Sequence, residues 1–236
     1  MKRLLFITGT DTGVGKTVLS VLLTRLLLKN GVNVAALKPI CSGGRGDARA
    51  LQSAMNGAST LRSSTATEDG LSLDEINPWH FRAPVAPVLA ARRERKHVSL
   101  ADVLAHIRAI QQRFEVVLIE GAGGLLSPLG ENFDSRDVLV SLRAAPIVVC
   151  PNQLGAVNRV LLTLEALPKS FRTRACVVLM GRPAADPATA ANAKLLAEFG
   201  DGQRILVLPW LGENFHIRPG LQNPAVRRGL WRLIQT

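Results

Sequence analysis

Residues 4–17, with the sequence LLFITGTDTGVGKT, decide the fold of this chain. A short apolar run leads into a glycine-rich segment that ends in Gly15-Lys16-Thr17, and the apolar segment 18–28 follows directly. This order is typical of a buried strand, a tight turn and a largely buried helix. Backbone amides of such a turn and of the helix start bind phosphate, Lys16 adds a positive charge, and the Thr17 hydroxyl is placed to ligate Mg²⁺. The segment therefore predicts a phosphate-binding loop.

The loop is a variant of the strict pattern G-x-x-x-x-G-K-[ST]. Thr10 stands where the first glycine of the pattern belongs, and Gly9 lies one residue early. A chance Gly-Lys-Thr is the alternative in a chain with 20 glycines. The position directly after an apolar N-terminal run favours the phosphate-binding interpretation.

Length and composition indicate a single domain over residues 1–236. The chain is 47% hydrophobic, which is enough for one large core, and no linker-like stretch divides it. No run is long and apolar enough to span a bilayer, and the N-terminal apolar run is too short for a signal peptide. We therefore expect a cytoplasmic protein without a membrane partner.

Cysteine usage and charge bear on other classes of function. Cys41, Cys150 and Cys176 lie far apart, so the sequence suggests neither a disulfide framework nor a zinc site. A net charge of +11 raises the question of nucleic acid, but the one dense basic cluster, residues 92–96, contains Glu94 and lacks flanking aromatic residues. We interpret the cluster as a solvated helix end, or as part of a field that steers a phosphate-rich ligand, and expect no nucleic-acid partner.

Strand-like and helix-like segments alternate beyond the loop. Continuous Val, Ile and Leu strands between helices predict an α/β fold with a mainly parallel central sheet covered on both faces. Residues 59–72, rich in Ser, Thr and Gly, are expected to form a flexible surface loop. Further strands are expected at 32–38, 116–119, 146–149, 175–179 and 205–208, and helices near 48–55, 99–110, 156–167, 190–199 and 225–234.

Polar residues follow two of these strands, where ligands of a parallel sheet bind. Lys38 ends one expected strand, and Ser42 and Asp47 follow in a turn-rich segment. Glu120 ends another, and the glycine-rich residues 121–124 after it let the backbone approach a ligand closely. Each residue taken alone fits ordinary loop chemistry equally well. Together with the phosphate-binding loop, they match what Mg²⁺-assisted phosphoryl transfer requires.

These residues belong to runs that resemble the dethiobiotin synthetase family in order and spacing: 9–17, 38–39, 117–124, 154–158 and 209–214. The resemblance implies a P-loop NTPase-like three-layer α/β/α fold and an ATP-dependent, Mg²⁺-requiring cyclo-ligase of biotin biosynthesis that acts as a homodimer. The implied substrates are 7,8-diaminononanoate, CO₂ or bicarbonate, and ATP or another nucleoside triphosphate. A substrate amine takes up CO₂ to give a carbamate, ATP phosphorylates the carbamate, and the neighbouring amine attacks the carbamic-phosphoric anhydride to close the ureido ring.

The resemblance also implies individual roles. Lys16 would hold the terminal phosphates, and Lys38 would stabilise the carbamate and the transferring phosphoryl group. Thr12 and Ser42 would hydrogen-bond the carbamate, which makes Lys38, Lys16, Thr12 and Ser42 the implied catalytic set. The implied Mg²⁺ ligands are Thr17, Asp47 and Glu120. The substrate carboxylate would be received across the dimer interface by Gly155, Ala156, Val157 and Asn158. The implied nucleotide-binding residues are Gly13, Val14, Gly15, Lys16, Thr17, Val18, Asp47, Glu120, Gly123, Gly181, Pro209, Leu211 and Glu213.

Three positions depart from the family pattern. Gly13 stands where an acid is frequent, and Gln153 stands where a lysine is common. The family usually places an asparagine and an aspartate that read adenine where this chain has Met180-Gly181-Arg182. Since Met180 is apolar and Arg182 offers donors but no acceptor, we expect weak selectivity for the nucleobase.

Three other interpretations fit parts of this sequence. A ParA/MinD-like P-loop ATPase switch is the main alternative, but that group carries a signature lysine near the start of its loop, where this chain has Asp11. Cobyrinate-amidating ligases add a glutaminase domain for which 236 residues leave no room. A degenerate, non-catalytic homologue is the third.

Overall fold

Six strands form one parallel sheet in the computed structural model, which describes residues 2–56, 70–184, 186–212 and 220–234. The strands are β1 (Arg3–Gly9), β2 (Val34–Leu37), β5 (Val116–Glu120), β8 (Ala145–Pro151), β9 (Cys176–Met180) and β10 (Arg204–Leu208). Their order is β10-β9-β8-β1-β5-β2, so β1 lies inside the sheet. The register pairs Ile7 of β1 with Glu120 of β5 on one side and with Ile147 of β8 on the other.

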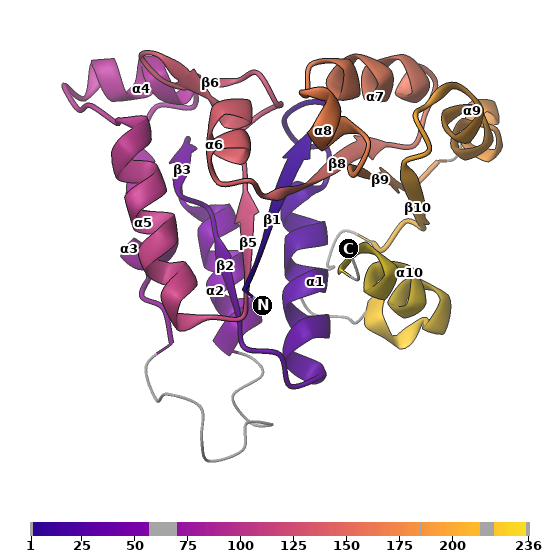
Figure 1. Ribbon diagram of the computed structural model, residues 1–236, viewed down its shortest axis with the longest axis horizontal. Coiled ribbons are helices and arrows are strands. Elements are labelled where there is room, and N and C mark those ends of the chain that lie inside the picture. Colours follow the sequence, from indigo (N-terminus) through magenta and orange to yellow (C-terminus); the bar gives the residue numbers. More distant parts are fainter. Residues whose placement is uncertain (1, 57–69, 185, 213–219, 235–236) are drawn as a thin grey trace.

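Helices cover both faces of this sheet, as Figure 1 shows. One layer consists of α1 (Lys16–Lys29), α2 (Gly46–Asn56) and α10 (Pro224–Ile234), which pack against one another and against the sheet. The other layer contains α5 (Leu100–Arg113), α6 (Ser135–Ser141), α7 (Ala156–Glu165), α8 (Lys169–Arg172) and α9 (Asn192–Phe199). The predicted three-layer α/β/α architecture is therefore confirmed.

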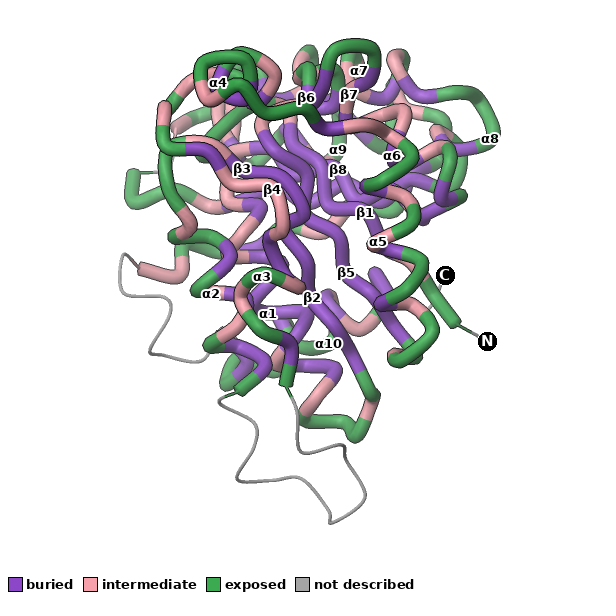
Figure 2. The backbone as a smooth tube through the Cα atoms, turned by 90° about the vertical axis from the view of Figure 1, so that its left-hand side faces the viewer, coloured by how far each residue is buried: buried purple, intermediate pink, exposed green. Residues whose placement is uncertain are grey.

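The core lies between these layers. Every residue of β2, β5 and β9 is buried, as expected for parallel strands that are covered on both faces. In Figure 2 the buried strands run through the middle of the molecule, and the exposed residues lie on the surrounding helices and loops. Residues Leu5, Phe6 and Ile7 of β1 are at most 2% exposed, so the apolar run before the loop is a core strand.

The predicted long elements are found, with their ends shifted by a few residues. The expected loop at 59–72 lies mostly outside the described residues, but its last residue, Ser72, caps a helix instead, because its hydroxyl accepts from the Glu75 amide. Short elements were not predicted, since two to seven residues carry too little periodicity to identify. They are β3 (Ile40–Ser42), α3 (Leu73–Ile76), β4 (Trp79–Phe81), α4 (Pro87–Arg93), β6 (Pro128–Gly130), β7 (Phe133–Asp134), α6, α8, and the 3₁₀ turns η2 (Pro187–Ala190) and η3 (Gly220–Gln222).

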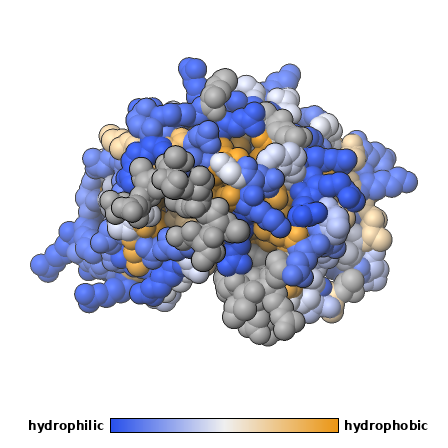
Figure 3. All heavy atoms as spheres, turned by 90° about the horizontal axis from the view of Figure 1, so that it is seen from below, coloured by the Kyte–Doolittle hydropathy of each residue, from blue (hydrophilic) through white to orange (hydrophobic). Residues whose placement is uncertain are grey.

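The two ends of the sheet differ. The carboxyl ends of β1 and β5 point upward in Figure 1, toward the loops before α1 and α6. The opposite end, seen in Figure 3, carries mostly hydrophilic residues with some apolar side chains between them. None of the helices in the described ranges combines the length and the apolar character that a membrane crossing needs. A ligand of this fold is expected at the carboxyl end.

Candidate active site

The predicted phosphate-binding loop connects β1 to α1. Gly13 and Gly15 have φ angles of 71° and 101°, in the left-handed region that favours glycine, and Gly15 is the N-cap of α1. A Cβ atom on Gly9 would lie 2.6 Å from Val14 Cγ2, so the early glycine is needed for the loop to close on itself. The Lys16 ammonium reaches back to the carbonyl oxygen of Asp11 at 2.8 Å. Loop amides and the start of α1 thus form an anion-binding turn.

A charged cluster lies beside this loop, with Lys38 and Glu120 buried and Asp47 half-exposed. Lys38 directly follows β2, Asp47 lies in the first turn of α2, and Glu120 ends β5. The Lys38 Nζ atom is 2.8 Å from Glu120 Oε1, 3.0 Å from Asp47 Oδ2 and 3.1 Å from the carbonyl oxygen of Gly121. The Thr17 hydroxyl donates to the same Glu120 Oε1 at 2.8 Å. The structure therefore brings Lys38 together with the three predicted Mg²⁺ ligands.

The cluster shifts the ionisation of its members. Burial by itself lowers the pKa of Lys38, but the Glu120 and Asp47 carboxyl groups outweigh burial and hold this pKa above its ordinary value. Burial raises the pKa of Asp47, yet the positive charge of Lys38 holds it below its ordinary value. Burial first, and the charge of Lys38 second, lower the pKa of Lys16 to about 8. Lys38 thus stays charged at physiological pH, whereas Lys16 titrates just above neutrality.

One polar contact of this cluster was not predicted. The Ser20 hydroxyl, on α1, lies 2.9 Å from Glu120 Oε2. The signal for it in the sequence is slight, because Ser20 is one of a few polar residues within the apolar run of α1 and could equally bond its own helix.

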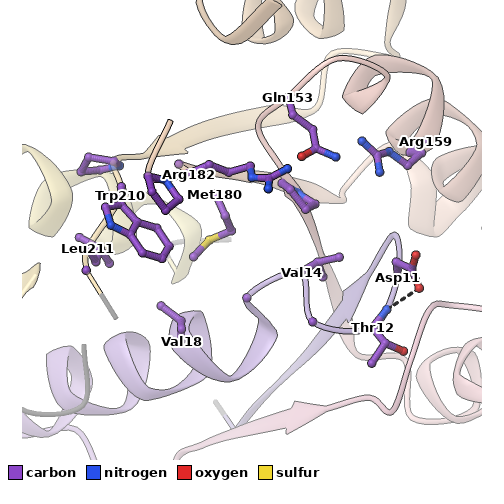
Figure 4. Close-up of a pocket in the computed structure, with 17 residues that line it drawn as sticks. Asp11, Thr12, Val14, Val18, Gln153, Arg159, Met180, Arg182, Trp210 and Leu211 are labelled. Atoms are coloured by element: carbon purple, nitrogen blue, oxygen red, sulfur yellow. Dashed lines mark hydrogen bonds between the residues drawn. The ribbon is translucent and has the colours of Figure 1, made fainter. Parts of the chain in front are cut away.

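A pocket of about 560 Å³ opens next to the loop and extends toward the ends of β9 and β10 (Figure 4). The residues at these strand ends include Trp210, which is 46% exposed and was not singled out from the sequence. Glu213, predicted to contact the nucleotide, lies outside the described residues. Predicted nucleotide residues that line the pocket are Gly13, Val14, Gly15, Val18, Gly181, Pro209 and Leu211.

The far end of this pocket offers few polar groups. The Gly181 amide donates to the carbonyl oxygen of Leu208 at 2.7 Å, and the Met180 carbonyl accepts from the Asn152 amide at 2.8 Å, so these backbone groups are already paired. The Met180 side chain packs against Gly15 of the loop, where an added Cβ would lie 3.1 Å from Met180 Cε. Arg182 is exposed, and in Figure 4 its side chain extends along the pocket toward the Gln153 side.

Of the two residues predicted to hydrogen-bond the carbamate, Thr12 lines the pocket and Ser42 is not among its lining residues. A Cβ on Gly123 would lie 3.7 Å from the Oγ1 atom of Thr12. Gly123 is thus beside Thr12 and is not among the residues that line the described pocket, so its assignment to the nucleotide stays a prediction. The Ser42 hydroxyl donates to the carbonyl oxygen of Val85 at 2.6 Å. It would have to turn away from Val85 to donate to a carbamate.

The start of α7 is also exposed to this region. Gly155, the N-cap, has a φ angle of 81°, and the first turn, which contains Ala156, Val157 and Asn158, holds no acidic residue. The amides of a first helical turn lack partners within the helix, so this end is suited to a carboxylate. Gln153 and Arg159, on either side of the turn, line the pocket described above.

Comparisons with known sequences identify relatives along most of the chain. A family model described as AAA domain matches residues 3–214. The chain is 38% identical over 213 residues to an ATP-dependent dethiobiotin synthetase of Anaeromyxobacter dehalogenans, covering 88% of this chain and 90% of that protein. It is 34% identical over 215 residues to the enzyme of the same name from Akkermansia muciniphila, covering 91% of this chain and 92% of that protein.

Solved structures with the same fold include partition and cell-division ATPases. A ParA family ATPase from Chlorobium tepidum has a TM-score of 0.61 at 13% identity, covering 99% of this chain and 100% of that one. A chain of the MinC:MinD cell division protein complex of Aquifex aeolicus has a TM-score of 0.64 at 14% identity, covering 99% of this chain and 96% of that one. At such low identity the likeness supports the P-loop NTPase fold alone.

Proposed function

The chain belongs to the dethiobiotin synthetase family, and we propose that it is itself an ATP-dependent dethiobiotin synthetase, a cyclo-ligase of biotin biosynthesis. It carboxylates 7,8-diaminononanoate with CO₂ and closes the ureido ring through a carbamic-phosphoric anhydride. The observation that carries the proposal is the contact of the buried Lys38 ammonium with Glu120 and Asp47 beside the phosphate-binding loop. This arrangement supplies positive charge where a carbamate and a triphosphate, both anions, must approach each other.

Mg²⁺ is part of the proposal, with Thr17, Asp47 and Glu120 as its protein ligands. Their donor atoms are a hydroxyl and carboxylate oxygens, and Mg²⁺ prefers oxygen ligands together with substrate phosphates. Lys38 contacts both carboxyl groups and Thr17 contacts Glu120, which supports a shared cation site at this point. The ion, when bound, neutralises charge on the phosphates of the nucleotide.

The lysines have separate tasks in this proposal. Lys16 holds the terminal phosphates, and Lys38 stabilises the carbamate and the phosphoryl group in transfer. An ammonium has three donors, and the contacts to Glu120, Asp47 and Gly121 engage all of them. Lys38 must therefore exchange at least one of these contacts to hold the substrate. Protein groups need supply no nucleophile, because the two amines of the substrate do so.

Substrate recognition extends over two subunits in the proposal. Thr12 and Ser42 bind the carbamate end, and the start of α7 from the partner of a homodimer receives the carboxylate. Leu154 and Leu162 support an interface here, since these large apolar residues at and along α7 are 79% and 63% exposed. A cytoplasmic location is also proposed, and it suits three cysteines that are all unpaired and buried.

A partner-binding ATPase switch of the ParA/MinD type is the other function that this fold allows. Asp11 stands at the position of the lysine that marks that group, and the structural likeness shows no more than the fold. We therefore do not favour it.

The test is product formation with labelled carbon. Purified protein is incubated with 7,8-diaminononanoate, ATP, Mg²⁺ and ¹³C-bicarbonate, and the products are analysed by mass spectrometry. Dethiobiotin that carries one ¹³C atom is expected, because the ureido carbon comes from CO₂. Absence of labelled dethiobiotin would contradict the proposal and favour a switch or a non-catalytic homologue.

A further inference from the structure

We propose that Ser20 orients the carboxylate of Glu120 and thereby sets the affinity of the site for its divalent ion. The inference deepens the proposed function, because it rests on Glu120 being a metal ligand. Ser20 is a positioning residue in this account, since it acts through Glu120 and touches neither nucleotide nor substrate.

The geometry of Ser20 points to this role. Ser20 lies on α1, one turn beyond Lys16, and is 1% exposed. Its Oγ atom is 2.9 Å from Glu120 Oε2 and 2.9 Å from the carbonyl oxygen of Lys16. A hydroxyl has one proton to donate, and a carboxylate attracts it more strongly than a neutral carbonyl does. The contact with Glu120 is therefore the stronger of the two.

The two oxygens of Glu120 are held unequally. Oε1 receives hydrogen bonds from Thr17 and Lys38, both of which have tasks with the ligands. Ser20 is the only donor to Oε2 within the described part of the chain. Glu120 is 2% exposed, so water cannot readily replace a lost partner. A carboxylate held at both oxygens keeps its plane, whereas one held at a single oxygen is free to rotate.

Thr24 provides a matched control on the same helix. Its hydroxyl is also buried, at 0% exposure, and donates to the carbonyl oxygen of Ser20 at 2.7 Å. Thr24 lies one turn farther from the site and makes no contact with Glu120 among the described residues. Ser20→Ala and Thr24→Val each remove one buried hydroxyl from α1, but only the first removes a partner of the carboxylate.

The experiment measures how much a divalent ion strengthens nucleotide binding. Calorimetry gives the Kd of a non-hydrolysable ATP analogue with and without Mn²⁺, and the ratio of the two values is the metal enhancement. Because orienting partners of metal ligands typically change metal affinity 10–100-fold, we expect Ser20→Ala to lower the metal enhancement about tenfold. Its metal-free Kd should stay within about twofold of the parent protein, and Thr24→Val should change neither quantity.

Two results would overturn the inference. One is an unchanged metal enhancement in Ser20→Ala, and the other is an equal loss in Ser20→Ala and Thr24→Val, which would show a general effect on α1. Thermal melting verifies that both variants are folded, and alanine is the residue that helices tolerate best. The measurement uses neither diamine nor turnover, so failure of the synthetase proposal in the ¹³C experiment would be a separate result.

Discussion

The two ends of the proposed nucleotide site differ in the kind of side chain that they present. At the phosphate end, Lys38, Asp47, Glu120 and Thr17 contact one another at 2.8–3.0 Å. At the base end, Met180 and Trp210 offer apolar surface, and the Met180 carbonyl and the Gly181 amide are already paired with Asn152 and Leu208. Buried polar networks impose strict geometry, whereas apolar surface accepts ligands of different shape. From this comparison we predict that the protein recognises the triphosphate closely and the nucleobase loosely.

Among the changes considered, removing the charge of Lys38 at the phosphate end should have the largest effect on activity. Lys38→Ala is expected to lower kcat for ring closure by roughly 10²–10³-fold, the loss seen when one transition-state charge partner is removed. Metal-free nucleotide affinity should change little, because Lys38 contacts carboxylates and not the loop. Steady-state kinetics and calorimetry measure the two quantities, with thermal melting as the check on folding. Near-normal turnover would show that Lys38 is only a structural partner of Glu120.

Lys16 should affect binding more than Lys38 does. Lys16→Ala is expected to weaken nucleotide binding by roughly 10–100-fold, since a hydrogen bond to a charged group contributes about 1.5–3 kcal/mol. The same factor is expected for ATP, CTP and GTP, because the contact is with phosphate. A loss confined to one base would contradict the separation of the two ends.

The pH dependence of binding tests the same residue. Burial lowers the pKa of Lys16 to about 8. A nucleotide binds more tightly to the protein when Lys16 is charged. Metal-free affinity for the fully ionised triphosphate should therefore fall about tenfold between pH 7 and pH 9, as the free Lys16 ammonium loses its proton. Binding at pH 9 should take up close to one proton, which calorimetry in buffers of different ionisation enthalpy detects. If Lys16→Ala shows the same fall in affinity with pH, a group other than Lys16 causes it.

The base end should show the smallest effect. We expect CTP and GTP to support dethiobiotin formation within about tenfold of ATP, a difference worth only about 1.4 kcal/mol. Strong discrimination requires buried polar groups that a wrong base leaves unpaired, and the Met180 carbonyl and the Gly181 amide already have partners within the protein. Steady-state kinetics with each triphosphate decide the matter. A preference for ATP above a hundredfold would mean that other groups read adenine.

The phosphate end was largely predictable from the sequence because its parts are local or follow from strand order. An apolar run followed by Gly15-Lys16-Thr17 predicted the β1–loop–α1 unit, and the expectation that parallel strands end at one edge brought Lys38 near Glu120. The contact between Ser20 and Glu120 was not predictable, since it depends on how α1 packs on β5. The same holds for Ser42, whose partner Val85 comes from a connection of short elements without periodicity.

At the base end, the sequence identified residues 180–182 as a departure from the family, but it did not predict how they pack. A Cβ on Gly181 would lie 2.4 Å from the backbone nitrogen of Trp210, so the glycine lets the segment after β10 pack directly against the end of β9. Such a close approach depends on two strands far apart in sequence. Any larger side chain at position 181 would therefore need a shift of residues 208–210.

Phosphate release under omission of single components tests the central claim most directly. The protein is supplied with diamine, bicarbonate, ATP and Mg²⁺, and each component is left out in turn while inorganic phosphate is measured. The account predicts phosphate release at the full rate only when all four are present, with one dethiobiotin formed for each phosphate. Equal ATP hydrolysis without the diamine, and no dethiobiotin in the complete mixture, would contradict the synthetase assignment and support an ATPase switch.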